Sequence, residues 1–257
     1  MRAALFAPER LAVVRGDPGE RRRFIDELLV QLHPRFYSVI REYERALRQR
    51  NSLLREAGGH APTGLEAWDE AVANPGGELC AGRADAIRAL APPAAQAYRN
   101  VGGESELQAR YAPKVAAPAE QEDAEAWARA IHEGLAARRA DELARGTTLV
   151  GPHRDDVELS IGELPARTHA SQGEAWLAAL ALVLGLHRAI AERVGTQPVL
   201  LLDDAFSLLD PERRERLGRC MPDGTHVLVA ASDERELPTS QRWELGRVTV
   251  AGVHFDD

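Results

Sequence analysis

Residues 199–210 read VLLLDDAFSLLD, and this stretch decides the fold of the chain. Four apolar residues, Val199 to Leu202, lead directly into the carboxylates of Asp203 and Asp204. A short, continuous apolar run predicts a strand that is buried on both faces of a parallel sheet. Acids that follow such a strand emerge at the edge where open α/β sheets bind ligands. In nucleotide-hydrolysing folds, one acid at this place holds Mg²⁺ and another orients the attacking water.

A second motif precedes this strand in the sequence. Residues 170–174 read ASQGE and open a long apolar segment. Free amides at a helix N-terminus, together with a serine hydroxyl and a glycine, form an anion site suited to a phosphate. A purely structural interpretation is also open, in which Ser171 caps the helix and Glu174 completes a capping box. Asp210 has the same two interpretations, because it directly precedes Pro211 and can cap the next helix.

The phosphate-binding loop that usually accompanies these motifs has no counterpart in the sequence. That loop requires Gly-x-x-x-x-Gly-Lys-Ser/Thr, because glycine amides wrap the phosphates and the lysine neutralises them. The chain has a single lysine, Lys114, without the required glycines before it or a hydroxyl residue after it. An ATP site therefore cannot be complete within these residues.

The composition is that of an ordinary globular protein. Of the 257 residues, 28% are charged and 44% are hydrophobic. The longest nearly apolar stretch, residues 175–186, is too short to span a membrane, so no membrane partner is expected. The two cysteines, Cys80 and Cys220, have neither a disulfide framework nor metal-ligand spacing. A reduced, cytoplasmic location is the simplest interpretation.

The charge is uneven along the chain. Residues 1–55 contain twelve arginines and seven acids, a net charge of +5, although the whole chain carries −8. A basic region of this kind supplies the phosphate contacts that dominate affinity for nucleic acids. The predicted DNA contacts are Arg21, Arg22, Arg23, Arg48 and Arg50. The alternative, which charge alone favours, is that these arginines only solvate helix faces.

Hydrophobic periodicity predicts helices in the first half and an alternation of strands and helices in the second, typical of an α/β fold with a mostly parallel sheet. Helices are expected over residues 21–31, 35–56, 65–72, 80–90, 93–99, 123–143, 173–194 and 211–220. Strands are expected over 147–150, 156–161, 199–203, 226–231 and 243–250, with a short strand and turn in residues 1–14. Asn74-Pro75-Gly76-Gly77 is predicted to be a loop.

Several segments together resemble landmarks of the RecF family, whose members are related to the SMC-type ABC ATPases. They are LFAPE (5–9), VRGDP (14–18), ERRRFID (20–26), TLVGPHRDD (148–156), the ASQGE motif and the acid-tipped strand. The resemblance implies an α/β fold, namely a partial P-loop ATPase-head sheet of the ABC/SMC type with an inserted helical lobe. Residues 1–16 would be a residual part of the head, 17–146 helical lobe II, and 147–257 the C-terminal half of the head.

The resemblance also implies roles for individual residues. Asp203, in the Walker B segment, would bind Mg²⁺, and Asp204 would be the catalytic residue that polarises the attacking water. The remaining residues implied to bind the nucleotide are Ser171, Gln172 and Gly173 of the signature motif and Asp210 of the D-loop. ATP and Mg²⁺ would be the cofactors, bound between two copies of the chain that dimerise when ATP binds.

By the same resemblance, the parent function is ATP-dependent binding of single-stranded or gapped DNA. It supports replication forks, recombination and the SOS response to DNA damage, in cooperation with other recombination mediators. Because the Walker A motif is absent, we expect a gene fragment or a misplaced start that does not hydrolyse ATP alone, with exposed sheet edges. The alternative is a non-catalytic DNA-binding scaffold with the shape of the head. A nucleotide-binding subunit of an ABC transporter is disfavoured by the position of Asp204 and by the long helical lobe.

Overall fold

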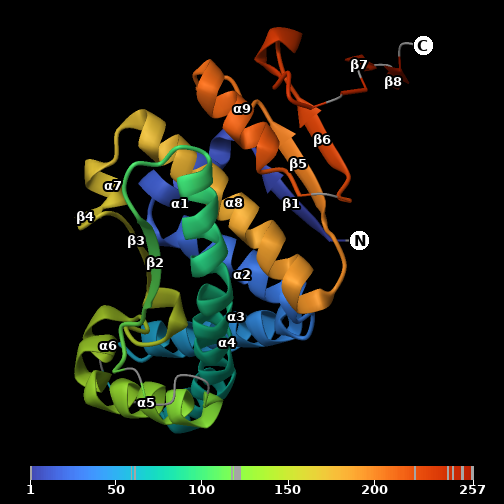
Figure 1. Cartoon of the computed structure of the whole chain (residues 1–257). Coiled ribbons are helices and arrows are strands. Elements are labelled where there is room, and N and C mark those ends of the chain that lie inside the picture. Colours follow the sequence, from blue (N-terminus) through green and yellow to red (C-terminus); the bar gives the residue numbers. More distant parts are fainter. Residues whose placement is uncertain are drawn as a thin grey trace.

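A three-stranded parallel sheet forms one side of the molecule in the computed structural model (Figure 1). The structure describes the chain except residues 1, 59, 61, 117, 119–122, 223, 242, 245, 250, 251, 256 and 257. The strands are β1 (Ala3–Phe6), β5 (Val199–Asp203) and β6 (Val227–Ala230), in the order β1-β5-β6. The parallel sheet expected around the acid-tipped strand is thereby confirmed.

One face of this sheet packs against α8 (Gln172–Val194). Phe6 and Leu202 point to this side and are buried, and the Phe6 ring meets Trp176 edge-on with centroids 5.1 Å apart. By length and composition alone, α8 is apolar enough to cross a membrane, but 83% of its apolar window is buried within the protein. It is the central helix of the core.

The opposite face of the sheet is open. The strand registers place Leu5, Leu201 and Leu228 in one row across β1, β5 and β6. The side chain of Leu5 is 40% exposed and that of Leu228 is 60% exposed. Parallel strands are normally covered on both faces, whereas this row of leucines is partly exposed to solvent.

Helices form the rest of the first half of the chain. They are α1 (Leu11–Arg15), α2 (Pro18–Leu32), α3 (Phe36–Glu56), α4 (Leu65–Asn100), α5 (Ala124–Ala137) and α6 (Arg139–Arg145), with a 3-10 turn at Pro8–Arg10. Asp17 caps α2, since its side chain accepts from the backbone N–H groups of Gly19 and Glu20. The long helix α4 is the spine of the molecule, with α3, α5 and α8 packed along it (Figure 1).

A second, antiparallel sheet connects the two halves. Its strands are β2 (Leu107–Ala112), β3 (Asp156–Ile161) and β4 (Leu164–Pro165), in that order. Because β2 pairs with β3, the predicted boundary at residues 146 and 147 is crossed by a sheet, and the division into domains stays a prediction.

The remaining elements are a 3-10 turn at Pro152–Arg154, α7 (Ala166–His169), α9 (Pro211–Arg219), a 3-10 turn at Glu234–Glu236 and the hairpin β7 (Gly246–Thr249)–β8 (Gly252–Phe255). The predicted closing strand 243–250 contains β7, while its residues 245 and 250 lie outside the described residues.

The predicted loop at residues 74–77 is wrong, because α4 continues through it. Gly77 explains the continuity. A Cβ atom at this position would lie 2.4 Å from the Ala124 carbonyl oxygen and 2.6 Å from the Ala128 nitrogen. The glycine thus lets α5 approach α4 closely, and this packing outweighs the low helix propensity of the Pro-Gly-Gly segment.

The predicted strand at residues 147–150 is also wrong. The backbone N–H groups of this segment donate to side chains instead of to a neighbouring strand. The Thr148 N–H donates to the Asn51 side chain at 2.7 Å, and the Leu149 N–H donates to the Glu142 carboxylate at 2.6 Å. These bonds replace a sheet ladder, because each N–H has one proton to donate. Two smaller corrections concern residues 11–14, which are helical rather than extended, and the helix predicted over 123–143, which breaks at Arg138.

Candidate functional site

The candidate site lies at the rim where the three parallel strands end. Asp203 is the last residue of β5 and is exposed, and Asp204 follows it and is half-buried. Because β1, β5 and β6 run in the same direction, their carboxyl ends meet at this rim. The strand therefore presents two adjacent carboxylates at the edge where a nucleotide-binding sheet binds its ligand.

Asp204 has an unusual backbone conformation that fixes its position. Its φ angle is +53°, and among the described residues no other non-glycine residue has a positive φ. Its N–H donates to the Ala230 carbonyl at 2.9 Å, and its carbonyl accepts from the Ser207 hydroxyl at 3.0 Å. Aspartate tolerates the left-handed region better than most residues, yet the conformation costs about 1–3 kcal/mol. Such outliers are concentrated at functional sites.

The signature motif begins α8 with a complete capping box. The Ser171 hydroxyl donates to the Glu174 carboxylate at 2.7 Å and accepts from the Glu174 N–H at 3.3 Å. Hydrogen bonds from the Ser171 backbone N–H and hydroxyl lower the pKa of Glu174. The structural interpretation of Ser171 is thus confirmed. It does not exclude a ligand, because Ser171 and Gln172 are exposed and Gly173 has open space around its Cα.

A direct contact joins the two motifs. The indole nitrogen of Trp176, near the start of α8, donates to the Ala205 carbonyl at 3.1 Å. Ala205 follows the acid pair, so the start of α8 and the end of β5 share one rim. On the other side of the motif, Arg15 donates to the Ala170 carbonyl at 2.7 Å. The structure brings together two motifs that are separated in the sequence.

Asp210 lies at the start of α9 and is exposed. Its carboxylate accepts from the Arg213 N–H at 2.9 Å and forms a weak ion pair with the Arg213 side chain at 3.6 Å. The predicted role as an N-cap is therefore confirmed. The nucleotide-binding role remains a prediction.

The acid pair fits half of a magnesium site. Mg²⁺ is usually bound by one or two carboxylates together with substrate phosphates and waters. Asp203 and Asp204 supply the carboxylates, while the loop that would hold the phosphates is absent from the sequence. Within the described residues, no group of three or more His, Cys, Asp or Glu side chains is arranged to bind a metal by itself. Mg²⁺ bound here would therefore depend on the nucleotide.

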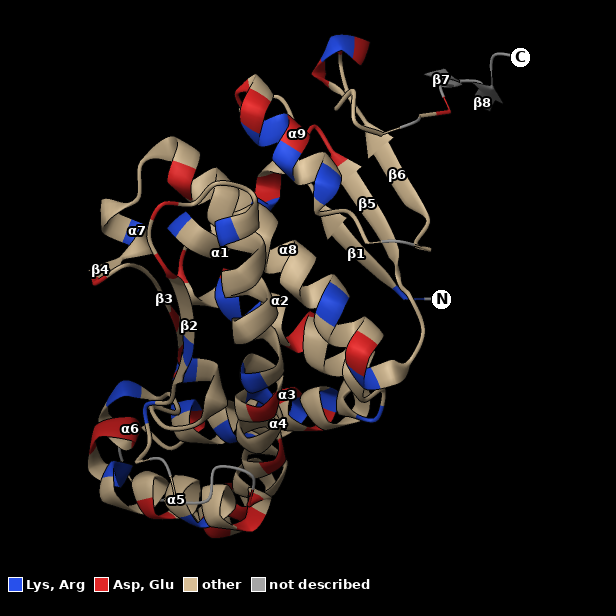
Figure 2. Ribbon diagram, viewed as in Figure 1, with Lys and Arg blue, Asp and Glu red and all other residues tan. Residues whose placement is uncertain are grey.

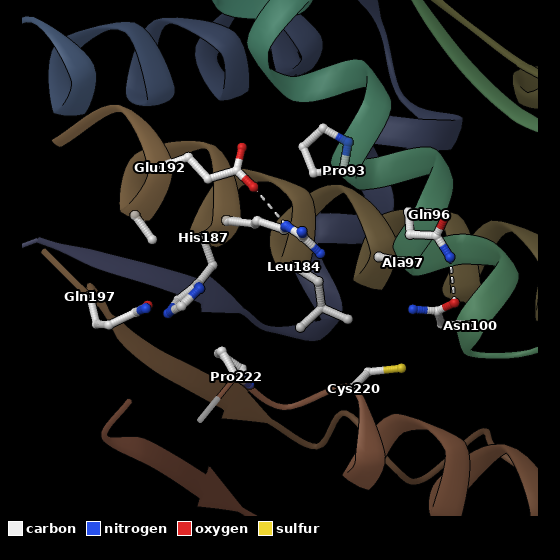
Figure 3. Close-up of a pocket in the computed structure, with 12 residues that line it drawn as sticks. Pro93, Gln96, Ala97, Asn100, Leu184, His187, Glu192, Gln197, Cys220 and Pro222 are labelled. Carbon is white, nitrogen blue, oxygen red and sulfur yellow. Dashed lines mark hydrogen bonds and ion pairs between the residues drawn. The ribbon is translucent and has the colours of Figure 1, made fainter. Parts of the chain in front are cut away.

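One cavity lies away from this rim. It has a volume of about 370 Å³ and lies between α4, α8 and the segment after α9 (Figure 3). His187 and Gln197, which line it, are near the end of α8 and the start of β5. This is the opposite end of the strand from Asp203, so the cavity does not belong to the acid rim.

Two of the five predicted DNA contacts are wrong. Arg50 is fully buried and bonds Asp69, Glu142 and Thr148 at 2.7–2.8 Å. Arg21 is also buried and holds the Asp156 carboxylate with two hydrogen bonds. Buried guanidinium groups must be paired within the protein, so neither is available to a phosphate.

The other three predicted contacts differ in their environment. Arg22 is half-buried and donates to the Asp155 carbonyl at 2.6 Å, and burial lowers its pKa. Arg23 and Arg48 have exposed side chains, each paired with a neighbouring glutamate of its own helix. Arg23 and Arg48 therefore stay candidates for DNA contact.

The buried polar residues around Asp155 were missed as a group by the sequence patterns. Asp155 is fully buried and accepts hydrogen bonds from the Tyr111 hydroxyl at 2.5 Å and from the Lys114 N–H at 2.8 Å. The Cys80 thiol lies beside it, and burial raises the pKa of this thiol. The TLVGPHRDD segment is thus a structural junction. Only the unusual density of charged residues in it signalled this role.

Fold and rim together define the class of this protein. A parallel sheet whose acid-tipped central strand meets a capped helix at one rim is an α/β nucleotide-binding ATPase head. Sequence comparison makes the assignment specific. The chain is 40% identical to the DNA replication and repair protein RecF of Renibacterium salmoninarum over 289 residues, covering 99% of this chain and 72% of that protein. It is 44% identical to RecF of Streptomyces avermitilis over 265 residues, covering 98% and 70%.

The chain therefore belongs to the RecF family of DNA replication and repair proteins, as the sequence landmarks indicated. Its structure is similar to that of the recombination mediator RecF of the RecFOR pathway, solved as RecF-ATPrS, with a TM-score of 0.82 at 25% identity. That match covers 92% of this chain and 64% of the solved one. The RecF-ATP structure gives a TM-score of 0.80. No protein-family model matches the chain.

Proposed function

We propose that this chain is the part of an ATP-operated recombination mediator that carries the signature, Walker B and D-loop motifs. The observation that supports it most is the shared rim: Asp203 and Ser171 are both exposed, and the Trp176–Ala205 hydrogen bond joins their segments. Burial of either side chain in the core would have excluded contact with a nucleotide. Solved RecF structures named for ATP and ATPrS add support for nucleotide binding.

In this proposal, the residues of the rim act in two groups. Asp203 binds Mg²⁺ and Asp204 polarises the attacking water, in the division of roles that phosphoryl-transfer sites share. The second group, which faces a γ-phosphate held by a partner subunit that carries the phosphate-binding loop, is Ser171, Gln172, Gly173 and Asp210. ATP thereby joins two subunits into a dimer, which is a homodimer where both subunits carry that loop, and closure of the dimer controls binding of single-stranded or gapped DNA.

The cellular role follows from the family. We propose that the protein acts with other recombination mediators at gapped or stalled forks, supporting replication and the SOS response. A cytoplasmic location fits the two cysteines, Cys80 and Cys220, which are both free thiols.

A mixed-dimer experiment tests the role of Ser171. A full-length RecF relative with its signature serine replaced by arginine keeps Walker A but cannot complete a partner's site. Adding this chain should restore ATP hydrolysis by at least about tenfold, because a lost phosphate ligand costs about 2–4 kcal/mol in the transition state. Ser171→Arg should abolish the rescue, whereas the matched surface change Ser240→Arg should leave it intact. Equal rescue by both variants would overturn the proposed role.

The non-catalytic scaffold stays the second candidate, and the absence of a phosphate-binding loop favours it. The two functions differ in how DNA affinity responds to nucleotide. In the mixed dimer, the first predicts tighter DNA binding with ATP than without it. The scaffold predicts the same affinity in both conditions, together with no restored hydrolysis.

A further inference from the structure

Helix α3 presents a row of side chains that its neighbours do not cover. Its buried face packs Phe36, Tyr43 and Leu54 into the core. The opposite face carries Tyr37, Arg41, Arg45, Arg48 and Arg55, which are all exposed, and we call this row the α3 stripe. Their spacings of four, four, three and seven residues keep them on one side of an α-helix.

Most of these arginines have no hydrogen-bonding or ion-pair partner among the described residues. Five arginines among the described residues make neither a hydrogen bond nor an ion pair with another described residue: Arg41, Arg45, Arg55, Arg145 and Arg167. Three of them belong to the α3 stripe. Arg145 is adjacent to it, because Gly146 abuts Arg55, with 3.2 Å between its ideal Cβ position and the Arg55 Cγ. The stripe with Arg145 is therefore the main group of unneutralised cations in the described structure.

Acids near the stripe do not cancel this charge. Glu44, on the same helix, pairs with Arg48 at the long distance of 3.8 Å. Glu56 accepts a hydrogen bond from Ser52 instead of an arginine. Basic and acidic residues are otherwise mixed over the longer helices (Figure 2), and the chain as a whole carries −8. A local excess of positive charge on an acidic protein suits an anionic ligand.

Tyr37 indicates what kind of anion fits. Its ring is 60% exposed, and the Arg41 guanidinium lies 5.9 Å from the ring centroid. An exposed aromatic ring beside a row of cations is the arrangement on which single-stranded nucleic acids stack their bases. From Tyr37 to Arg55 the stripe is about 27 Å long at 1.5 Å per residue, which matches about eight phosphates of one strand.

We infer that the α3 stripe, extended by Arg145, binds the backbone of a single DNA strand, with Tyr37 stacked on a base. The inference rests on the proposed DNA-repair function and specifies the surface that contacts DNA. A single strand is favoured over a duplex because only an unpaired base can leave its stack and cover Tyr37. An acidic protein surface would use the arginines but would not require the exposed ring.

The test measures binding of the complete chain to labelled oligothymidine of about 20 nucleotides, and to a duplex of equal length, over a range of salt. Arg41→Gln/Arg45→Gln/Arg55→Gln should weaken oligothymidine binding at least about tenfold and lower the salt slope by about 2, since each phosphate contact contributes about 0.7. The matched control is Arg110→Gln/Arg129→Gln/Arg188→Gln, which removes the same charge from side chains that are 79%, 64% and 63% exposed. The control should bind within about twofold of the unmodified chain.

Tyr37→Leu and Tyr37→Phe separate stacking from charge. The leucine variant should lose about tenfold in affinity for oligothymidine with an unchanged salt slope, while the phenylalanine variant should bind normally. Equal weakening by the two triple variants would overturn the inference and leave the proposed function intact. If Tyr37→Leu left the affinity for oligothymidine unchanged, and the duplex bound as tightly as the single strand, the single-strand assignment would be overturned. Absence of DNA binding by the unmodified chain, both alone and in the mixed dimer with ATP, would instead remove the proposed function itself.

Discussion

The two faces of helix α3 use the same residue type for opposite purposes. Arg48 is on the outer face with its side chain 66% exposed, whereas Arg50, two residues later, is fully buried. Arg50 bonds Asp69, Glu142 and Thr148 in a network that spans three segments of the chain. Position on the helix, rather than local charge, therefore separates an arginine that stabilises the fold from one that is available to a ligand.

Replacing these two arginines should produce the largest contrast in stability. Arg50→Ala leaves Asp69 and Glu142 buried without their shared cation, which costs about 3–5 kcal/mol of the free energy of unfolding. Arg48→Ala should cost less than about 0.5 kcal/mol, because an exposed ion pair contributes little. Urea unfolding of both variants measures the difference. If the two variants had similar free energies of unfolding, Arg50 would not act as the structural member of the pair.

The pH dependence of stability should show the same contrast between buried and exposed groups. Burial is the main reason that the pKa of His153 is lowered to about 4, although the Thr148 carbonyl opposes the shift. Its neutral ring fits two bonds: Nδ1 accepts from the Tyr43 hydroxyl at 2.6 Å, and Nε2 donates to the Thr148 carbonyl at 3.1 Å. Burial raises the pKa of Tyr43, so this hydroxyl keeps its proton for the bond.

Because the folded pKa of His153 lies below the unfolded value of about 6.5, the unfolded state binds the proton more tightly. The stabilisation of the folded state is complete above about pH 6.5. It is lost as the pH falls through about 4, by about 3 kcal/mol in total. Urea unfolding at several pH values should show this slope. It should persist in the variant His132→Gln, which changes an exposed histidine, and disappear in His153→Gln.

The smallest effects on stability are expected at the acid rim. Asp203→Asn and Asp204→Asn should each change the free energy of unfolding by less than about 0.5 kcal/mol, because the Asp203 side chain is exposed and asparagine also tolerates a positive φ. When the chain is joined to the Walker A segment of a full-length RecF relative, so that its own site is complete, both variants should nevertheless abolish hydrolysis. A large loss of stability in either variant would mean that the carboxylates serve the fold and not a ligand.

Much of the fold was predictable because the relevant signals are local. The apolar run before Asp203 forms a strand in any chain that can bury it, and Asp17, Ser171 and Asp210 cap helices through bonds to neighbouring backbone. The family landmarks added the arrangement of these elements. The errors at residues 74–77 and 147–150 have one cause, since both segments are shaped by partners far away in the sequence.

The sequence by itself determined the parallel strand, the helix caps, the two rim motifs and the RecF-family membership, because each depends on residues close together in the chain. Tertiary structure alone decided which arginines are buried, that Asp204 adopts a left-handed conformation and that α8 begins beside the acid pair. These features depend on packing between segments up to about 150 residues apart, and a polar group is stable in the interior only where such packing brings a partner to it.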